Sequence, residues 1–546
     1  MDIIYFRFTN QRTTRSVFSE FQNETNISQI ITHGIVEHWY VSLCAVILIF
    51  ILYKLYRKPA DVEKKKYSTR ANLLYYLSNT LLMAALIYTA VIGMRGGAGA
   101  SIRPITLSNA NEYVNKSTET AIVLNTPFCF IRTFNKKVYK NPHYFKNEEV
   151  LEALYSPLHY PKPAEEFKPL NVVIIILESF GKEYSGFFNK DLDNGTYKGY
   201  TPFLDSLYAE GLTFKYSYAN GRKSIDAMPS ILSGIPMFIE PFISTHYSTN
   251  QISGIADILK EKGYYSAFFH GAPNGSMGFS AYANVARFDE YFGMSEYPRA
   301  KDDYNGWWGI WDEEFLQFYA GKMAEMKQPF VTSVFTLTSH HPFWLPERYE
   351  GQFPKGTQAI HQCIGYTDYA LRLFFQKIAQ QDWYSNTLFV ITADHTNQIA
   401  HDEYYTDANL YAVPILFYQP GSNLKGLIET MPVQQMDITP SILGYLNYDK
   451  PYFAFGQDIF NTNEADKFAV NYNNQLYQFY QQDYFMQFDG QEVKSVYNYK
   501  TDILLHNNLA GKVKEQDEME TKLKAIIQQY IERMVDNKLT VTAKEK

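Results

Sequence analysis

The sequence predicts an α/β fold in which a mostly parallel β-sheet lies between layers of helices. Residues 171–177, Asn-Val-Val-Ile-Ile-Ile-Leu, form a continuous apolar run, which is typical of a strand buried on both faces of a parallel sheet. Similar runs recur at 265–269, 330–337, 387–392 and 413–418. Segments with a helical pattern separate them, at 202–210, 254–262, 312–326 and 360–380. This alternation indicates helices packed on both faces of one sheet.

The length, net charge and number of cysteines limit the classes of protein to which this chain can belong. At 546 residues the chain is too long for one compact core, so we expect more than one structural unit. The net charge of −7 argues against nucleic acid as a partner. Three cysteines do not make a disulfide framework, although they leave a Cys129–Cys363 bridge open.

Residues 1–100 are predicted to be a membrane region with two transmembrane helices, at about 35–55 and 71–94. The second stretch has 24 residues without a charged side chain, which is long enough to cross a bilayer. The alternative is a pair of buried core helices. The connecting loop is rich in cations, so the positive-inside rule places it in the cytoplasm and everything after Arg95 outside. These cations are Lys54, Arg57, Lys58, Lys64, Lys65, Lys66 and Arg70.

The rest of the chain divides by composition. Residues 101–168 are predicted to be a helical connector that ends in a Pro-rich linker, and 169–450 are the α/β domain. Polar and aromatic residues alternate at 467–480, 484–489 and 493–499, with a hairpin signal at Asp489-Gly490. These runs predict a small antiparallel sheet within 451–510. Residues 511–546 are predicted to be a charged helix and a tail.

Chemically reactive side chains follow four of the predicted strands. Glu178 follows the first strand, His270 the second, His340 and His341 the third, and Asp394 and His395 the fourth. In parallel sheets, ligands bind at the carboxyl ends of the strands. Taken singly, each residue also fits a structural role, such as a hydrogen-bonded histidine or a helix-capping acid. Together, carboxylates and imidazoles on one edge of a sheet predict a divalent-cation site.

Residues 218–230 supply a candidate nucleophile. Ser224 lies beside Arg222 and Lys223, before an apolar run that could open a helix. Free backbone N–H groups at such a helix start attract anions. The structural alternative is a serine that caps the helix. Beside a metal ion, a serine hydroxyl can act as a nucleophile at neutral pH.

These motifs resemble those of lipoteichoic acid synthase-type enzymes. The motifs are, in order, Leu177-Glu-Ser-Phe180, Gly221-Arg-Lys-Ser-Ile-Asp-Ala227, Phe269-His-Gly271, Thr338-Ser-His-His-Pro-Phe343 and Ala393-Asp-His395. That family comprises membrane-bound phosphoglycerol transferases in the sulfatase branch of the alkaline phosphatase superfamily. The resemblance covers about residues 165–460. It implies an alkaline phosphatase/sulfatase-like fold and a multi-pass protein of the bacterial inner or plasma membrane with an extracytoplasmic catalytic domain.

The resemblance also implies roles for individual residues. Glu178, Asp394 and His395 would bind one divalent metal ion, most often manganese in this family, with magnesium or zinc as alternatives. Ser224 would be the nucleophile and fourth ligand. His340 would serve the leaving group, with His341 as its rival, while His270, Lys223 and Arg222 would contact substrate. The implied donor is a phosphatidylglycerol-like membrane lipid, and the acceptor is a cell-envelope glycan or glycolipid.

Some positions depart from the family pattern. Relatives that handle phosphoglycerol carry Trp and Arg seven and nine residues after the pocket histidine, where this chain has Met277 and Phe279. A phosphoethanolamine transferase and a phosphodiesterase or sulfatase-type hydrolase therefore remain alternatives. The sulfatase pattern requires Pro and Arg two and four residues after the nucleophile, where this chain has Asp226 and Met228. The non-enzymatic alternative is a membrane-tethered sensor or scaffold.

Overall fold

The computed structural model describes residues 12–13, 32, 35–56, 68–95, 120–134, 139–244, 247, 250–274 and 276–541. Several predictions concern residues outside these ranges, so their outcome lies outside the described structure. They include most of the cation-rich loop, with Arg57, Lys58 and Lys64 to Lys66. Part of the 101–168 connector and the last five residues of the C-terminal tail also lie outside it.

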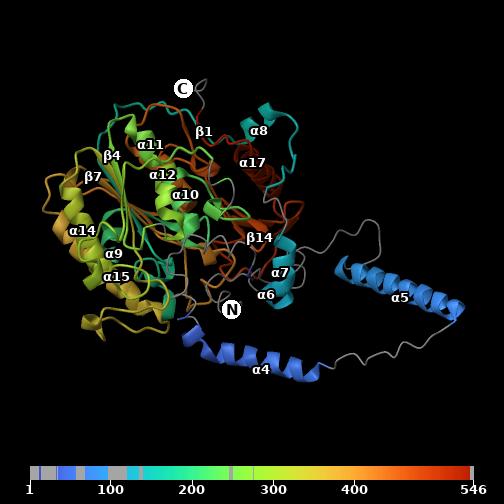
Figure 1. The fold of residues 1–546 in the computed structure, drawn as a ribbon. Helices are drawn as coiled ribbons and strands as arrows, with labels where there is room; N and C mark the ends of the chain where they lie inside the picture. Colours follow the sequence, from blue (N-terminus) through green and yellow to red (C-terminus); the bar gives the residue numbers. More distant parts are fainter. Residues whose placement is uncertain are drawn as a thin grey trace.

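The core of the molecule is an eight-stranded sheet, which confirms the predicted α/β fold (Figure 1). Its strands lie in the order β5-β4-β6-β2-β7-β8-β3-β9. The strands are β2 (Asn171–Leu177), β3 (Leu212–Tyr218), β4 (Tyr265–His270), β5 (Glu290–Phe292), β6 (Phe330–Phe335), β7 (Thr387–Ala393), β8 (Ile415–Tyr418) and β9 (Gly426–Gln434). Every side chain of β2, β6 and β7 is buried, as expected of strands covered on both faces.

One strand of the sheet runs against the others. β8 pairs antiparallel with β7 on one side and with β3 on the other, whereas the remaining pairs are parallel. The apolar sequence at 413–418 predicts a buried strand correctly, but burial alone does not fix direction. The sheet is therefore mixed, with seven of its eight strands parallel.

Helices cover both faces of this sheet. One face packs against α10 (Ser224–Ser233), α11 (Ile255–Lys260), α12 (Phe279–Val285) and α16 (Ile438–Tyr445). α17 (Gln516–Val535) belongs to the same apolar core but packs against the smaller sheet described below. The other packs against α9 (Pro202–Glu210), α14 (Asp312–Ala324) and α15 (Ile360–Ile378). Alternate residues of β2 divide between the two cores, with Ile174 on the first face and Ile175 on the second. The short helices are α6 (Thr120–Val123), α7 (Thr126–Thr133), α8 (Glu148–Leu154) and α13 (Ala300–Asp303).

A second, antiparallel sheet follows the main domain, as predicted. It contains β11 (Phe468–Asn473), β12 (Leu476–Gln481), β13 (Tyr484–Phe488) and β14 (Val493–Asn498), paired in sequence order. The run at 467–480, predicted as one segment, is two strands, because Asn474 and Gln475 turn the chain with positive φ angles of 47° and 68°. Side-chain hydrogen bonds from Gln434 at the end of β9 tie this sheet to the main one. A separate pair joins β1 (Leu158–His159) to β10 (Tyr452–Phe453).

The C-terminal helix α17 packs against the segment that precedes the α/β domain, around Tyr139 and Phe145. α17 contributes Leu523, Ile527 and Tyr530 to the core. The Tyr530 hydroxyl lies 3.2 Å from that of Tyr139, and the backbone N–H of Phe145 donates to Gln528. The two segments are therefore packed together although they lie far apart in the sequence.

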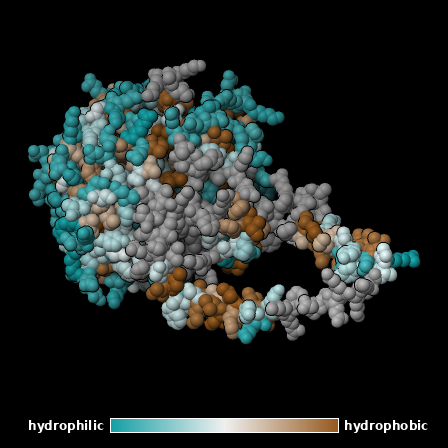
Figure 2. All heavy atoms as spheres, in the orientation of Figure 1, coloured by the Kyte–Doolittle hydropathy of each residue, from teal (hydrophilic) through white to brown (hydrophobic). Residues whose placement is uncertain are grey.

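Two apolar helices stand outside this body, α4 (Trp39–Leu55) and α5 (Thr69–Arg95). Figure 2 shows their apolar side chains on the surface. Within α5, residues Thr69–Gly93 are long and apolar enough to cross a membrane, and none of the most apolar stretch is buried. α4 is apolar as well but has only 17 residues, so the transmembrane span predicted at about 35–55 stays a prediction. Cys129 and Cys363 are both buried, and the disulfide between them that the sequence left open is not formed.

Candidate functional site

The predicted reactive residues gather at one edge of the main sheet. β4, β6, β2 and β7 are consecutive neighbours in the sheet and run in the same direction. His270 is the last residue of β4, Glu178 follows β2 and Asp394 follows β7. His340 lies on the loop after β6. Parallel strand ends therefore bring together side chains that are far apart in the sequence.

Glu178, Asp394 and His395 form a buried cluster whose ligand atoms lie within 4.8 Å of one another. The His395 Nε2 atom is 3.2 Å from an Asp394 oxygen and 3.8 Å from a Glu178 oxygen. The other imidazole nitrogen, Nδ1, lies 2.7 Å from the carbonyl oxygen of Thr396, which turns Nε2 toward the carboxylates. Two carboxylates and one imidazole thus point to a common centre.

Ser224 completes this cluster. Its Oγ donates to Glu178 at 2.9 Å and lies 3.5 Å from His395 Nε2. Ser224 is the first residue of α10, and the Asp226 carboxylate accepts the backbone N–H groups of Arg222 and Lys223 just before it, both at 3.1 Å. This turn holds the serine at the helix start and facing the carboxylates. The predicted nucleophile and the three predicted ligands are therefore adjacent.

Backbone contacts fix the two carboxylates. One Asp394 oxygen accepts the N–H groups of Ser179 and His395, both at 2.6 Å. Ser179 has a positive φ angle of 61°, which non-glycine residues rarely adopt. This conformation turns the chain directly after β2, and the Ser179 hydroxyl donates to Glu178 at 2.6 Å.

The electrostatics of the cluster favour a bound cation. Burial, followed by the neighbouring charge of Asp394, raises the pKa of Glu178 to about 7. Burial likewise raises the pKa of Asp394 to about 7 and lowers that of His395. The second Asp394 oxygen is buried and has no hydrogen-bond partner in the described part of the chain. A divalent ion would neutralise both carboxylates and occupy that oxygen, so these residues fit such an ion.

His340 lies beside this cluster. Burial lowers the pKa of His340, and the charge of Glu178 opposes this only in part. The Trp308 ring packs on the imidazole with 4.2 Å between ring centroids, and its indole N–H donates to the carbonyl oxygen of His341. The loop residues just before His340 are held by Asp312, whose carboxylate accepts the N–H groups of Leu337 and Thr338.

Arg222, two residues before Ser224, is buried. One guanidinium nitrogen donates to the carbonyl oxygen of Leu410 at 3.0 Å. The other two, Nε and Nη2, are buried without a hydrogen-bond partner among the described residues. Buried, unsatisfied donors on a positive group suit a negatively charged ligand. Lys223 lies next to Arg222 and is partly buried.

The two remaining predicted residues differ in their placement. His270 is buried beside Phe279, with 4.6 Å between ring centroids, and its Nδ1 atom lies 3.0 Å from the carbonyl oxygen of Phe335. His341 is not brought to the cluster, because its imidazole points toward Glu37.

Sequence patterns alone did not identify several supporting residues. Gln435 donates to the carbonyl oxygens of Ala393 and Asp394, and Asn397 donates to the Ser179 hydroxyl. Neither lies in a motif. Trp308 and Asp312 lie in a stretch rich in aromatic and acidic residues, and its sequence does not indicate what they contact.

Comparison with known proteins identifies a matching family and several similar proteins. The family described as Sulfatase matches residues 170–448, just over half of the chain. Lipoteichoic acid synthase-like YvgJ of Bacillus subtilis (strain 168) is 25% identical over 372 residues, which cover 63% of this chain and 59% of that protein. Phosphoglycerol transferase I of Citrobacter koseri is 27% identical over 261 residues, 44% of this chain and 33% of that protein. The chain thus spans less than two thirds of either relative.

A solved structure shares the fold. It is a protein in the alkaline phosphatase superfamily from Vibrio parahaemolyticus, with a TM-score of 0.62 and 21% sequence identity. The similarity covers 73% of this chain and 98% of that one. The predicted alkaline phosphatase/sulfatase-like architecture is therefore confirmed.

Proposed function

The chain belongs to the sulfatase family, and we propose that it is a membrane-anchored transferase that moves a phosphoglycerol-type group from a lipid head group to a cell-envelope acceptor. The observation that carries this proposal is the contact between Ser224 Oγ and the Glu178 carboxylate, within the cluster of Asp394 and His395. The similarity to a lipoteichoic acid synthase-like protein and to a phosphoglycerol transferase supports the choice of group.

The residues present suit a divalent ion, for which we propose manganese. Glu178, Asp394, His395 and the Ser224 hydroxyl would hold it, and when bound it would lower the pKa of that hydroxyl. Oxygen donors predominate in this set, which favours manganese or magnesium over softer ions.

Ser224 attacks the phosphorus of a lipid phosphodiester. A bond forms between Oγ and phosphorus, the bond from phosphorus to the lipid alcohol breaks, and the serine carries the phospho-alcohol group. An acceptor hydroxyl then takes the group and restores Ser224. The buried Arg222 guanidinium, with two nitrogens directed to no described partner, is positioned to bind the phosphate oxygens.

His340 is the proposed carrier of the proton that Ser224 loses and the departing alcohol gains. Its Nδ1–H group donates to the carbonyl oxygen of His341 at 3.0 Å, which fixes the ring and leaves Nε2 to take up that proton and release it to the alcohol. Trp308, packed on the same ring, holds that orientation. We propose that His270 and Phe279 border the alcohol portion of the donor, at the position where this chain departs from its relatives.

The proposal is tested by intact-mass spectrometry of the full-length protein in detergent with manganese. The donors offered are phosphatidylglycerol and phosphatidylethanolamine. We expect a phosphoglycerol adduct on the wild-type protein and none on Ser224→Ala. Ser230→Ala, which changes a buried serine six residues further along the same helix, serves as the control and should keep the adduct.

Other results would change the assignment. A phosphoethanolamine adduct would indicate the other head group and a different transferase. Release of free glycerol phosphate without acceptor would indicate a hydrolase. An adduct that persists in Ser224→Ala would show that this serine is not the nucleophile.

A further inference from the structure

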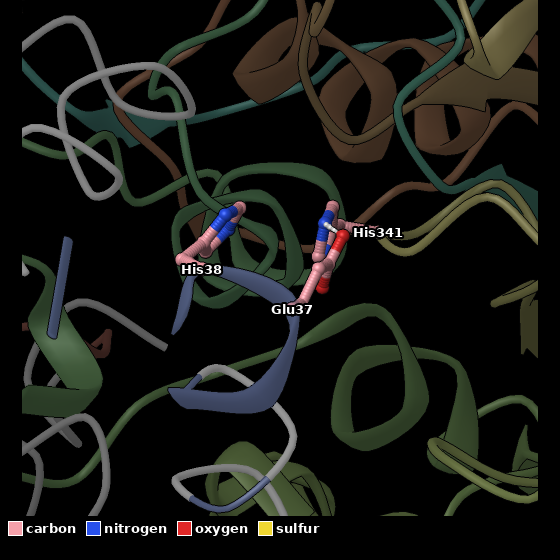
Figure 3. Close-up of side chains that lie close together, drawn as sticks. All are labelled: Glu37, His38 and His341. Atoms are coloured by element: carbon pink, nitrogen blue, oxygen red, sulfur yellow. Dashed lines mark hydrogen bonds and ion pairs between the residues drawn. The ribbon is translucent and has the colours of Figure 1, made fainter. Parts of the chain in front are cut away.

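A second group of potential metal ligands lies apart from the candidate active site. Glu37 and His38, just before α4, meet His341 on the loop after β6 (Figure 3). The Glu37 carboxylate lies 3.2 Å from His341 Nε2, and the two imidazole rings are close to parallel, 27° apart, with centroids 6.5 Å apart. Each residue offers one ligand atom, and these atoms lie within 4.8 Å of one another.

We propose that these three residues bind a second divalent metal ion of the zinc class. Two imidazoles and one carboxylate, with a fourth position open to water, form a donor set that zinc accepts readily. The three side chains are partly exposed, so an ion can enter from solvent. An ion pair between Glu37 and His341 alone does not account for His38, whose ring lies beside that of His341.

The donor chemistry separates this site from the catalytic one. The catalytic cluster offers two carboxylates, one imidazole and a hydroxyl, whereas the second site offers two imidazoles and one carboxylate. Nitrogen donors shift preference toward zinc and away from magnesium and manganese. The two sites can therefore be filled and measured independently, and this inference does not depend on the proposed reaction.

The second site would connect the start of the apolar helix α4 to the loop that carries His340. Glu37 and His341 are 304 positions apart in the sequence. The backbone of His341 faces the catalytic side, where its carbonyl oxygen accepts the Trp308 indole N–H and lies 3.0 Å from His340 Nδ1. Its imidazole faces Glu37. A bound ion would hold the start of α4 next to the residue that follows the proposed proton donor.

The test is a zinc titration of the full-length protein in detergent, with bound metal counted by mass spectrometry of the elements. The Glu178→Gln/Asp394→Asn variant removes carboxylate ligands from the catalytic cluster. We expect this variant to retain one zinc equivalent. When Glu37→Gln/His38→Gln is added, the affinity for this remaining zinc ion should fall by more than roughly 10–100-fold, which is the loss caused by removing an outer-shell partner.

A matched control changes an exposed acid and an exposed imidazole elsewhere, Glu350→Gln/His506→Gln, and should leave the zinc equivalent unchanged. The same Glu37→Gln/His38→Gln change in the wild-type background should lower total zinc by one equivalent, which covers the case of a catalytic-site variant that fails to fold. In the Glu178→Gln/Asp394→Asn background, cobalt in place of zinc should give the absorption of a four-coordinate ion only while Glu37 and His38 are present. Zinc binding that is unaffected by Glu37→Gln/His38→Gln would overturn the proposal.

Discussion

The loop that carries His340 depends on the buried carboxylate of Asp312, which accepts two backbone N–H groups and the Thr367 hydroxyl. In Asp312→Asn, an amide NH₂ would face one of these donors, and a buried donor would lose its acceptor. We expect a loss of about 2 kcal/mol in the free energy of unfolding, measured with denaturant. Adduct formation should slow several-fold, because His340 would no longer be held in place.

Asp302→Asn is the control for this change. Asp302 is exposed, and its carboxylate lies 3.9 Å from the guanidinium of the nearby Arg299. Its replacement should change stability by less than about 0.5 kcal/mol. Equal effects of the two substitutions would show that Asp312 does not hold the loop.

His361 makes stability depend on pH. Its ring stacks on Tyr200 with 4.0 Å between centroids, and burial lowers its pKa to about 4. Between pH 4 and about 6.5 the unfolded chain binds a proton on this residue that the folded protein does not, so the free energy of unfolding falls as the pH is lowered through that range. We expect His361 to contribute about 1–2 kcal/mol to this fall. Denaturation curves at several pH values measure it.

His361→Asn provides the comparison. The Asn Oδ1 atom can replace His Nδ1 as acceptor for the N–H groups of Thr357 and Gln358, but it does not titrate. The pH dependence between 4 and 6.5 should therefore be shallower in this variant. An unchanged slope would assign the acid sensitivity to other groups.

At the level of single residues, the sequence locates the candidate site well. Glu178 and Asp394 directly follow continuous apolar strands, so the position of each strand end places the carboxylate. Residues that support these side chains are harder to predict, because Gln435 and Asn397 act through hydrogen bonds to segments distant in the sequence. His341 directly follows His340, yet the chain directs the two imidazoles to different surroundings.

The start of α10 depends on a glycine. A Cβ atom on Gly221 would overlap the Asp226 side chain, which accepts the N–H groups of Arg222 and Lys223. We expect Gly221→Ala to destabilise the protein by about 1–3 kcal/mol and to displace Ser224, which would slow adduct formation. Thermal unfolding and the adduct assay measure the two effects.

Gly321→Ala gives the matched comparison. Gly321 lies within α14, and a Cβ atom there would meet nothing within 4 Å. Because alanine favours helix over glycine, this change should stabilise the protein by up to about 1 kcal/mol. If Gly221→Ala behaves in the same way, the turn before α10 does not require glycine.

Among the strands, those in the middle of the sheet can be predicted from the sequence, whereas β9 at one edge cannot. β2 and β7 are buried throughout and mostly apolar, because both of their faces are covered. β9 lies at the edge of the sheet, contains Pro432 and exposes its first residues, so its sequence lacks the same signal. The direction of β8 was not predictable either, because a short apolar strand has the same composition in both orientations.

For the whole molecule, α5 is expected to hold the chain in a bilayer. Leu82→Arg/Leu86→Arg introduces two charges into its exposed apolar surface, each costing about 2.5–3.5 kcal/mol at the centre of a membrane. We expect the variant to move from the membrane fraction to the soluble fraction after an alkaline wash. Ile503→Arg/Leu504→Arg, which changes exposed apolar residues of the body, should remain with the membrane.

The packing of α17 against the segment at Tyr139 bears on how the protein is made. Tyr139 emerges from the ribosome first, and its partner Tyr530 follows 391 residues later. At the usual 5–20 residues per second, the interval between them is roughly 20–80 s. During that time, the apolar surface that α17 will cover has no partner. The core of the domain is therefore completed only after α17 has been synthesised, and until then the surface that it covers is prone to aggregation.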